Sequence, residues 1–169
     1  MEEKLVGLIS DTHDNLRAVD KALEVFKDHN VELILHAGDW IAPFTLKRIA
    51  KGGIKVIGVF GNNDGERKML LELAKKYDIR LEAEIATINT DGKKIAITHG
   101  TSNVIIEALA KSSMFDVVVF GHTHRKELRR VKNTLLINPG EACGYLSGEP
   151  TVAILNVKTM DVKFVALTF

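Results

Sequence analysis

The first half of the chain repeats one pattern three times: a short apolar run, a polar loop, and a segment with apolar residues at helical spacing. This pattern predicts alternating strands and helices over residues 5–9, 16–26, 31–35, 41–51, 55–60 and 66–76. Strands that alternate with helices are typical of a parallel βαβ arrangement. Ligands bind beyond the carboxyl ends of such strands, so functional residues are expected in the loops that follow the apolar runs.

The second half is richer in predicted strands. Asp91-Gly92 is a hairpin turn signal between two apolar-alternating segments. The predicted elements are a hairpin over 84–89 and 94–98, a helix over 103–111, a strand over 116–120, and hairpins over 127–131 with 134–138 and over 150–157 with 162–168. More than eight strands indicate two packed sheets with helices outside them.

Composition narrows the class of protein. The 169 residues fit one domain with a core that needs no disulfide, and the single Cys143 excludes an intrachain one. A net charge of +1 carries no strong signal for nucleic-acid binding. No run approaches the roughly 20 apolar residues of a membrane helix, and no signal-type segment precedes the first strand. We therefore expect a cytoplasmic protein.

Five polar loops that directly follow predicted strands carry metal-binding residue types. They are Asp11-Thr12-His13, Gly38-Asp39, Gly61-Asn62-Asn63-Asp64, His99-Gly100 and Gly121-His122-Thr123-His124. Four of the six histidines of the chain lie in these loops. Carboxylate, imidazole and amide oxygen without thiolate suit Mn²⁺, Fe, Ni²⁺, Co²⁺ or Zn²⁺. Seven candidate ligands are too many for one tetrahedral ion and suit two ions that share a carboxylate.

The order and spacing of these motifs (D-x-H, GD, GN, H and GHTH) resemble the calcineurin-like metallophosphoesterase family from about residue 5 to residue 138. The small size and the Asn138-Pro139-Gly140 segment resemble its compact bacterial and archaeal phosphodiesterase branch. The resemblance implies an α/β (α+β) fold, a four-layer αββα sandwich of two mixed β-sheets flanked by helices. One domain would span residues 1–169, with the site at the strand ends on one edge.

The resemblance also implies two ligand sets. They are Asp11, His13 and His124 for the first ion, Asn62, His99 and His122 for the second, and Asp39 bridging both. A hydroxide held between the ions would attack phosphorus in line. The resemblance thus assigns His122 and His124 to different ions, a split that alternating side-chain directions along an extended backbone would allow. The glycines before three of these ligands are expected to let the backbone turn sharply.

Asn63 departs from the commonest family pattern, which has histidine after the ligand asparagine. An amide can donate a hydrogen bond to substrate but cannot supply a proton near pH 7. The compact branch often lacks this histidine. We expect Asn63 to contact substrate and catalysis to depend on the metals, with a preference for good leaving groups.

Several of these candidate residues also have a structural role as an alternative. Helix capping is an alternative for Asp11 and Asp39, and turn formation is an alternative for Asn62. We expect Asp64 to cap the following helix rather than support a ligand, and His36 to be structural. Cys143 is expected to be a small buried apolar side chain and not a nucleophile.

The prediction for function is a binuclear metal-dependent phosphodiesterase acting on a small phosphoester, with two divalent transition metal ions, Mn²⁺ or Ni²⁺ ahead of Fe, Co²⁺ and Zn²⁺. One alternative is a non-catalytic protein-interaction scaffold of the same fold, such as the small retromer subunit, which resembles this branch but has lost part of its ligand set. A phosphomonoesterase of the same family is the other. The sequence carries no sign of membrane attachment or of oligomeric state. A homodimer, common in related proteins, stays open.

Overall fold

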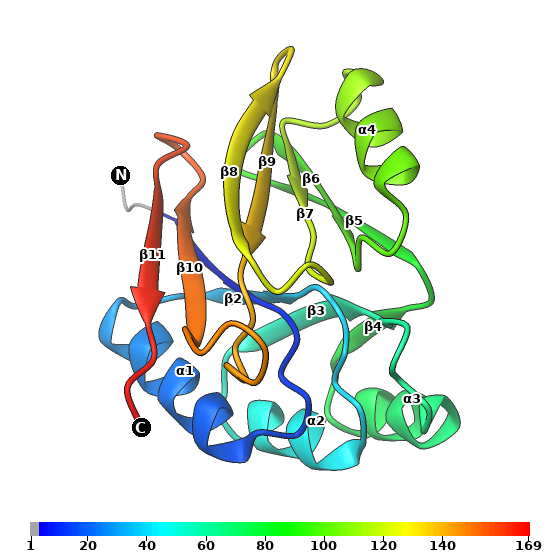
Figure 1. The fold of residues 1–169 in the computed structure, drawn as a ribbon, viewed down its shortest axis with the longest axis vertical. Coiled ribbons are helices and arrows are strands. Elements are labelled where there is room, and N and C mark those ends of the chain that lie inside the picture. The colour runs from blue at the N-terminus through cyan, green and yellow to red at the C-terminus, as the bar shows by residue number, and fades with distance from the viewer. Residues whose placement is uncertain (1–3) are drawn as a thin grey trace.

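The computed structural model describes residues 4–169 and arranges them in four layers (Figure 1). One sheet is covered by three helices, the second sheet packs on its other face, and a fourth helix lies outside that second sheet. The elements are β1 (Leu5–Ile9), α1 (Leu16–Asp28), β2 (Leu33–His36), α2 (Pro43–Ala50), β3 (Lys55–Val59), α3 (Arg67–Lys76), β4 (Arg80–Glu82), β5 (Ile85–Thr90), β6 (Lys93–Thr98), α4 (Asn103–Lys111), β7 (Val117–Val119), β8 (Lys126–Val131), β9 (Thr134–Pro139), β10 (Thr151–Asn156) and β11 (Val162–Ala166). The predicted four-layer sandwich of two mixed sheets is confirmed.

The first sheet has the strand order β11-β10-β1-β2-β3-β4. Strands β1 to β4 run parallel, and the C-terminal hairpin of β10 and β11 adds to β1 in antiparallel fashion. The predicted βαβ repeat of the first half is therefore confirmed. The second sheet, β5-β6-β7-β9-β8, has a parallel centre of β6, β7 and β9 with antiparallel strands at both edges.

The central strands alternate their side chains between two hydrophobic cores. In β1, Val6 and Leu8 face the second sheet, while Ile9 joins the core under the helices. In β7, Val117 faces inward and Val118 packs under α4. Three cores between four layers explain why the central strands read as continuous apolar runs.

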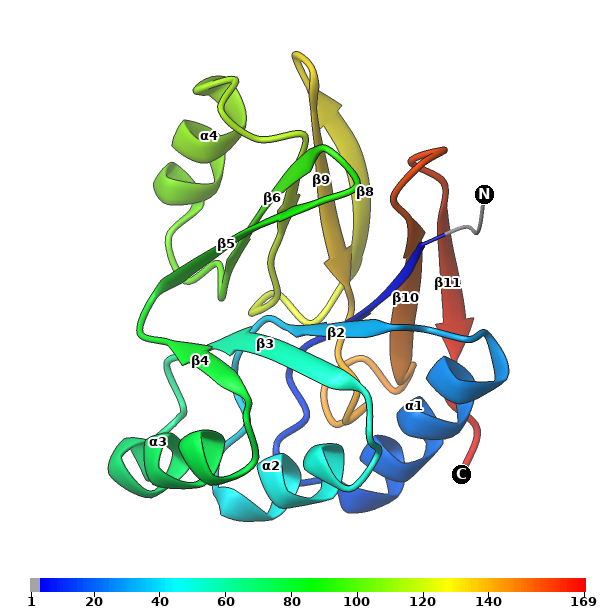
Figure 2. The same cartoon turned by 180° about the vertical axis from the view of Figure 1, so that it is seen from behind.

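Element boundaries differ from the sequence prediction in two instructive places. The helix expected over 41–51 begins at Pro43, because Ile41 has a φ of 79° that no α-helix accommodates. The short strand β4 was not predicted, since its sequence Arg80-Leu81-Glu82 lacks apolar alternation and depends on pairing with β3. Figure 2 shows β4 leading directly into β5, so this segment carries the chain from one sheet to the other.

We expect Gly7→Ala to destabilise the fold by about 1–3 kcal/mol, the usual cost of overpacking a core. A Cβ at Gly7 would lie 2.8 Å from ring atoms of Phe26, which is fully buried between α1 and β1. Gly65→Ala is the matched control, because within residues 4–169 no atom beyond its two chain neighbours lies within 4 Å of the Cβ it would add. Urea unfolding in EDTA measures both variants. Equal stability of the two would contradict the close packing described for β1.

Candidate metal centre

The seven predicted ligands converge at one edge of the sandwich. Each follows a parallel strand: β1, β2 and β3 of the first sheet, β6 and β7 of the second. In that order the strands position Asp11 with His13, then Asp39, Asn62, His99, and His122 with His124. The carboxyl ends of the parallel strands of both sheets therefore meet at one place, as expected for a site in an α/β fold.

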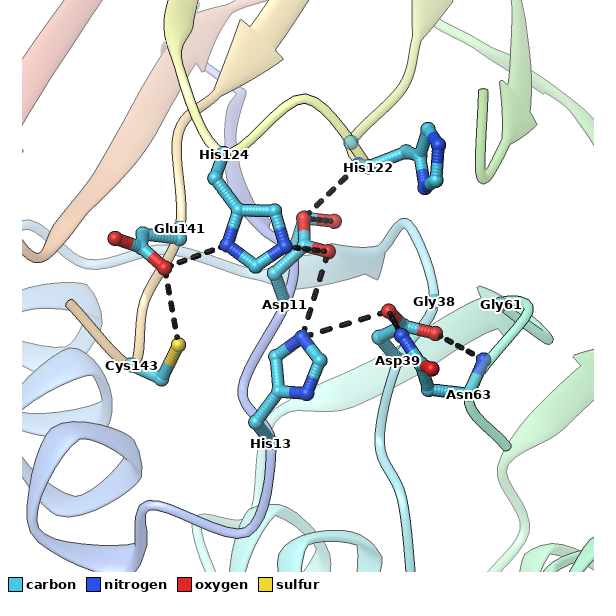
Figure 3. Close-up of polar contacts among 12 residues, drawn as sticks. Asp11, His13, Gly38, Asp39, Gly61, Asn63, His122, His124, Glu141 and Cys143 are labelled. Carbon is cyan, nitrogen blue, oxygen red and sulfur yellow. Dashed lines mark hydrogen bonds and ion pairs between the residues drawn. The ribbon is translucent and has the colours of Figure 1, made fainter. Parts of the chain in front are cut away.

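The first group of side chains gathers around Asp11 (Figure 3). His124 Nε2 lies 3.5 Å and His13 Nε2 lies 3.8 Å from Asp11 Oδ1. The rings of His13 and His124 have centroids 5.3 Å apart. We call Asp11, His13 and His124 the first cluster.

The second group gathers around His99. Its Nε2 lies 2.9 Å from Asn62 Oδ1, and its ring meets that of His122 edge-on at a centroid distance of 5.2 Å. We call Asn62, His99 and His122 the second cluster. Asp39 lies between the clusters, with Oδ2 3.4 Å from His13 Nε2 and 3.4 Å from His99 Nε2.

Two of the imidazoles are fixed in the form that binds a metal through Nε2. His99 donates from Nδ1 to the carbonyl of Ala37 at 2.7 Å, and His124 donates from Nδ1 to the carboxylate of Glu141 at 2.5 Å. Because carbonyls and carboxylates only accept, Nδ1 carries the proton in both rings and a neutral ring offers the lone pair of Nε2. Hydrogen bonds of this kind orient histidine ligands in metal sites.

The donor set fits a cation. Among residues 4–169, the buried polar atoms without a hydrogen-bond partner include Asp11 Oδ1 and His13 Nε2. Ligand atoms of Asp11, His13 and Asp39 lie within 4.8 Å of one another. Carboxylate oxygens facing lone pairs in a buried pocket repel one another unless a positive charge lies among them. A divalent ion would supply that charge.

The surroundings of Asp39 shift the pKa of its carboxyl group. Burial would raise the pKa of its carboxyl group, but the neighbouring His99 and the hydrogen bonds from Asn63 hold that pKa well below its usual range. Burial opposes protonation of His99, yet the Asp39 carboxylate raises the pKa of this imidazole overall. Asp39 is thus an anion held in place for a positive partner.

The backbone at the site is strained in a consistent way. Five of the seven predicted ligands have positive φ, a conformation that is uncommon for residues other than glycine. The angles are 53° at Asp11, 42° at His13, 60° at Asp39, 67° at His122 and 60° at His124. Clustering of such residues is typical of functional sites.

His122 and His124 face different clusters, but not for the predicted reason. The expected extended backbone is wrong, because both residues are left-handed. Figure 3 shows the His124 ring over Asp11 and the His122 ring turned away from it. Two left-handed residues separated by Thr123 therefore produce the split that strand alternation was expected to give.

The three glycines also act differently from one another. Gly38, with a φ of 95°, makes the predicted sharp turn. Gly61 and Gly121 allow close approach: a Cβ would lie 2.1 Å from Asp39 Oδ1 at Gly61 and 1.8 Å from Ser10 Oγ at Gly121. Because Gly121 has no Cβ, its loop comes close enough to the loop after β1 for the His122 amide to donate to Asp11 Oδ2 at 3.1 Å.

Asp64 supports the ligand loops, and the expectation that it caps α3 is wrong. Its carboxylate accepts from the amides of Asp39, Ile41 and Gly61 at 3.2, 2.7 and 2.7 Å. The N-cap of α3 is Glu66, which makes no side-chain capping bond. Burial raises the pKa of Asp64, while the amide hydrogen bonds oppose that rise.

His36 has the structural role predicted for it. Its ring stacks on Trp40 with centroids 3.6 Å apart. Nδ1 accepts from the Gly38 amide at 3.1 Å, and Nε2 lies 3.1 Å from Thr12 Oγ1. Burial lowers the pKa of His36 well below its usual value, so the ring stays neutral and links the loops after β1 and β2.

Glu141 is a site residue that the sequence analysis missed. Its fully buried carboxylate accepts from His124, from the Cys143 thiol at 3.2 Å, and from the amides of Leu146 and Ser147. Burial would raise the pKa of Glu141, but these donors lower it to about 2. It follows β9, another parallel strand of the second sheet, so the rule that located the other five loops could have found it.

Beside the clusters, Asn63 contacts Asp39 and Cys143 contacts Glu141. Asn63 donates from its amide side chain to Asp39 Oδ2 at 2.8 Å and from its backbone to Oδ1 at 2.9 Å. Cys143 is buried. Burial, with a smaller contribution from Glu141, raises the pKa of its thiol to about 12. A thiol so rarely ionised fits the predicted packing role and not that of a nucleophile.

A two-sheet sandwich with imidazole, carboxylate and amide side chains gathered at its parallel strand ends presents a ligand set that suits divalent metal ions. The family model described as the calcineurin-like phosphoesterase superfamily domain matches residues 5–160. The chain therefore belongs to the calcineurin-like phosphoesterase superfamily.

Individual relatives agree with this membership. A phosphodiesterase of Methanocaldococcus jannaschii is 41% identical over 165 residues, which cover 96% of this chain and 98% of the relative. The solved structure of an archaeal phosphodiesterase has a TM-score of 0.92 and 39% identity, covering 96% of this chain and 99% of that one. Vps29 of Entamoeba histolytica has a TM-score of 0.70 at 19% identity, covering 97% and 99%, which shows the shared fold alone.

We expect Glu141→Gln to weaken Mn²⁺ binding at the first cluster by about 10–100-fold, the usual effect of removing a hydrogen-bond partner of a metal ligand. A glutamine amide has one accepting oxygen, which cannot satisfy the four donors that meet the carboxylate. Isothermal titration calorimetry of the metal-free protein would then resolve one weakened site.

Glu149→Gln is the matched control, because Glu149 lies in the same loop and its exposed side chain pairs with Lys126 at 3.4 Å rather than with His124. Its Mn²⁺ isotherm should match that of the wild type. A Glu141→Gln isotherm with both sites unchanged would show that Glu141 does not orient His124.

Proposed function

We propose that this protein hydrolyses phosphodiesters at a centre of two divalent metal ions. The observation that carries the proposal is the pair of clusters joined by Asp39, with Nε2 of His99 and His124 presented by hydrogen bonds at Nδ1. The 41% identical relative named as a phosphodiesterase supports this choice of reaction.

The proposed ligands follow the two clusters. Asp11, His13 and His124 would hold one ion, Asn62, His99 and His122 the other, and Asp39 would contact both. Imidazole, carboxylate and amide oxygen favour Mn²⁺ or Ni²⁺, with Fe, Co²⁺ and Zn²⁺ also compatible. When bound, two such ions activate water and stabilise negative charge on phosphoryl oxygens.

Residues that contact the proposed ligands hold them in position. Asp64 and His36 fix the loop that carries Asp39, and Glu141 fixes the ring of His124. Asn63 can donate a hydrogen bond toward substrate when its amide leaves Asp39, but it has no proton to give to a leaving group. Substrates whose leaving groups depart without protonation should therefore react fastest.

A scaffold role is the alternative from a different class, and the fold shared with Vps29 suggests it. Complete ligand sets argue against it, because all seven positions carry competent ligands. A phosphomonoesterase is the second alternative, and comparing bis- with mono-p-nitrophenyl phosphate separates the two activities. Within residues 4–169, no helix combines the length and hydrophobicity needed to span a membrane. A cytoplasmic location and a homodimer remain predictions.

Asp39→Ala is expected to bind fewer than two equivalents of Mn²⁺ and to lose more than about 100-fold in diesterase activity, since even residues behind the ligands cost 10–100-fold. Metal analysis after dialysis and initial rates with bis-p-nitrophenyl phosphate measure both effects. Asp20→Ala, at a half-exposed carboxylate paired with Arg48, is the control and should retain both. Two tightly bound equivalents in Asp39→Ala would contradict the bridging role.

Asn63→His should make the rate less dependent on the leaving group, because an imidazole can supply the proton that an amide cannot. The measurement is kcat/KM across p-nitrophenyl, phenyl and alkyl diesters, with metal content checked in parallel. Asn133→His, in the exposed β8–β9 turn, is the control. An unchanged dependence on leaving-group pKa in the Asn63 variant would refute the role proposed for this position.

A further inference from the structure

We infer that a hollow beside the second cluster binds the ester substituent that stays on phosphorus during hydrolysis, and that this substituent is an uncharged aromatic group such as an aryl ring or a nucleobase. The inference rests on the proposed phosphodiesterase function and extends it to the class of substrate. It depends on the position, the lining and the charge of the hollow.

The hollow lies next to the proposed metal site. It has a volume of about 270 Å³, and Asn62 and His99 of the second cluster form part of its wall. Residues 83–85, between β4 and β5, and Ser102 with Ile105, at the start of α4, also line it. A group bound there would lie directly beside a phosphoryl group held between the clusters.

Size favours one substituent over a whole ligand. Pockets that enclose a complete drug-sized ligand usually have about 300–1,000 Å³. A larger hollow of about 770 Å³ lies at the amino ends of β2 and β3, and it shares no lining residue with either cluster. The smaller hollow is therefore the one placed to receive part of a substrate whose phosphorus lies at the clusters.

The lining is apolar where a flat group would pack. Phe60, Ile85 and Ile105 all line the hollow; Phe60 is buried, while Ile85 and Ile105 keep 39% and 42% of their surface exposed. Exposed apolar side chains gathered at the mouth of a concave site are typical of ligand pockets. An aromatic substituent would bury both isoleucine side chains.

Charge at the rim is balanced. Arg67 and Glu84 both line the hollow, so it holds one cationic and one anionic group. Arg67 is fixed over the Phe60 ring, 5.1 Å from its centroid, and donates to the carbonyls of Gly61 and Asp64 at 3.0 Å each. The charged side chains of the lining therefore give no electrostatic reason to expect a charged substituent.

Hydroxyl groups supply the polar contacts that orient a ligand. Thr101 and Ser102 line the hollow at the start of α4. Ser102 occupies the N-cap position of α4 yet makes no side-chain capping bond, so its hydroxyl is available to an incoming group. Apolar walls with a few hydroxyls match an aromatic ring that carries carbonyl or amide groups.

The experiment compares three p-nitrophenyl phosphodiesters that share a leaving group and differ in the second substituent: methyl, phenyl and thymidine-5′. With the Mn²⁺-loaded protein, kcat/KM for the phenyl and thymidine esters should exceed that for the methyl ester by about tenfold or more, chiefly through KM. Ile105→Asp should reduce this ratio to about one third or less of its wild-type value, and Ile85→Asp should do the same.

Val104→Asp is the matched control. Val104 neighbours Ile105 on α4, is 77% exposed, and does not line the hollow. This variant should keep both the wild-type ratio and the wild-type rates. A ratio that stays unchanged in both isoleucine variants, or a wild-type ratio near one, overturns the inference.

A second readout needs no hydrolysis. In the metal-free protein, thymidine should shift the methyl NMR signals of Ile85 and Ile105 through the ring current of the base, and leave those of Val104 unmoved. Shifts without hydrolysis of any of the three diesters would overturn the proposed function alone. Hydrolysis without shifts and without substituent preference would overturn only the aromatic pocket.

Discussion

The buried carboxylate of Asp39 is the charge on which the site depends. It lies 3.4 Å from an imidazole of each cluster, and its pKa is held well below the usual range. A buried anion is costly unless it is paired and hydrogen-bonded. The fold meets this requirement with Asn63, His99 and a loop held by Asp64, so the neighbouring strand ends are organised around one negative charge.

Placing the ligand side chains around Asp39 requires strained backbone conformations. Left-handed residues on the loops after β1, β2 and β7 aim the side chains inward, and they persist because hydrogen bonds accepted by His36, Asp64 and Glu141 hold those loops. Gly61 and Gly121 let neighbouring loops approach within distances that a Cβ would forbid. The site is therefore a property of several loops together and not of any single motif.

The apolar runs and loop positions allowed the parallel strands β1 to β3, the two-sheet architecture and the seven candidate ligands to be predicted. These features follow from local periodicity and from the rule that ligands gather at strand ends. The left-handed backbone at His122, the role of Asp64 and the contact of Glu141 with His124 were not predicted. Each depends on contacts between segments far apart in the chain, such as the 25 positions that separate Asp39 from Asp64.

The most direct test of the account is a crystal structure with Mn²⁺, using anomalous scattering to locate the ions. The account predicts two anomalous peaks, one bonded to Nε2 of His124 and to Asp11, the other bonded to His99, His122 and Asn62, with Asp39 contacting both. A single peak, or one ion bonded to both His122 and His124, would contradict it.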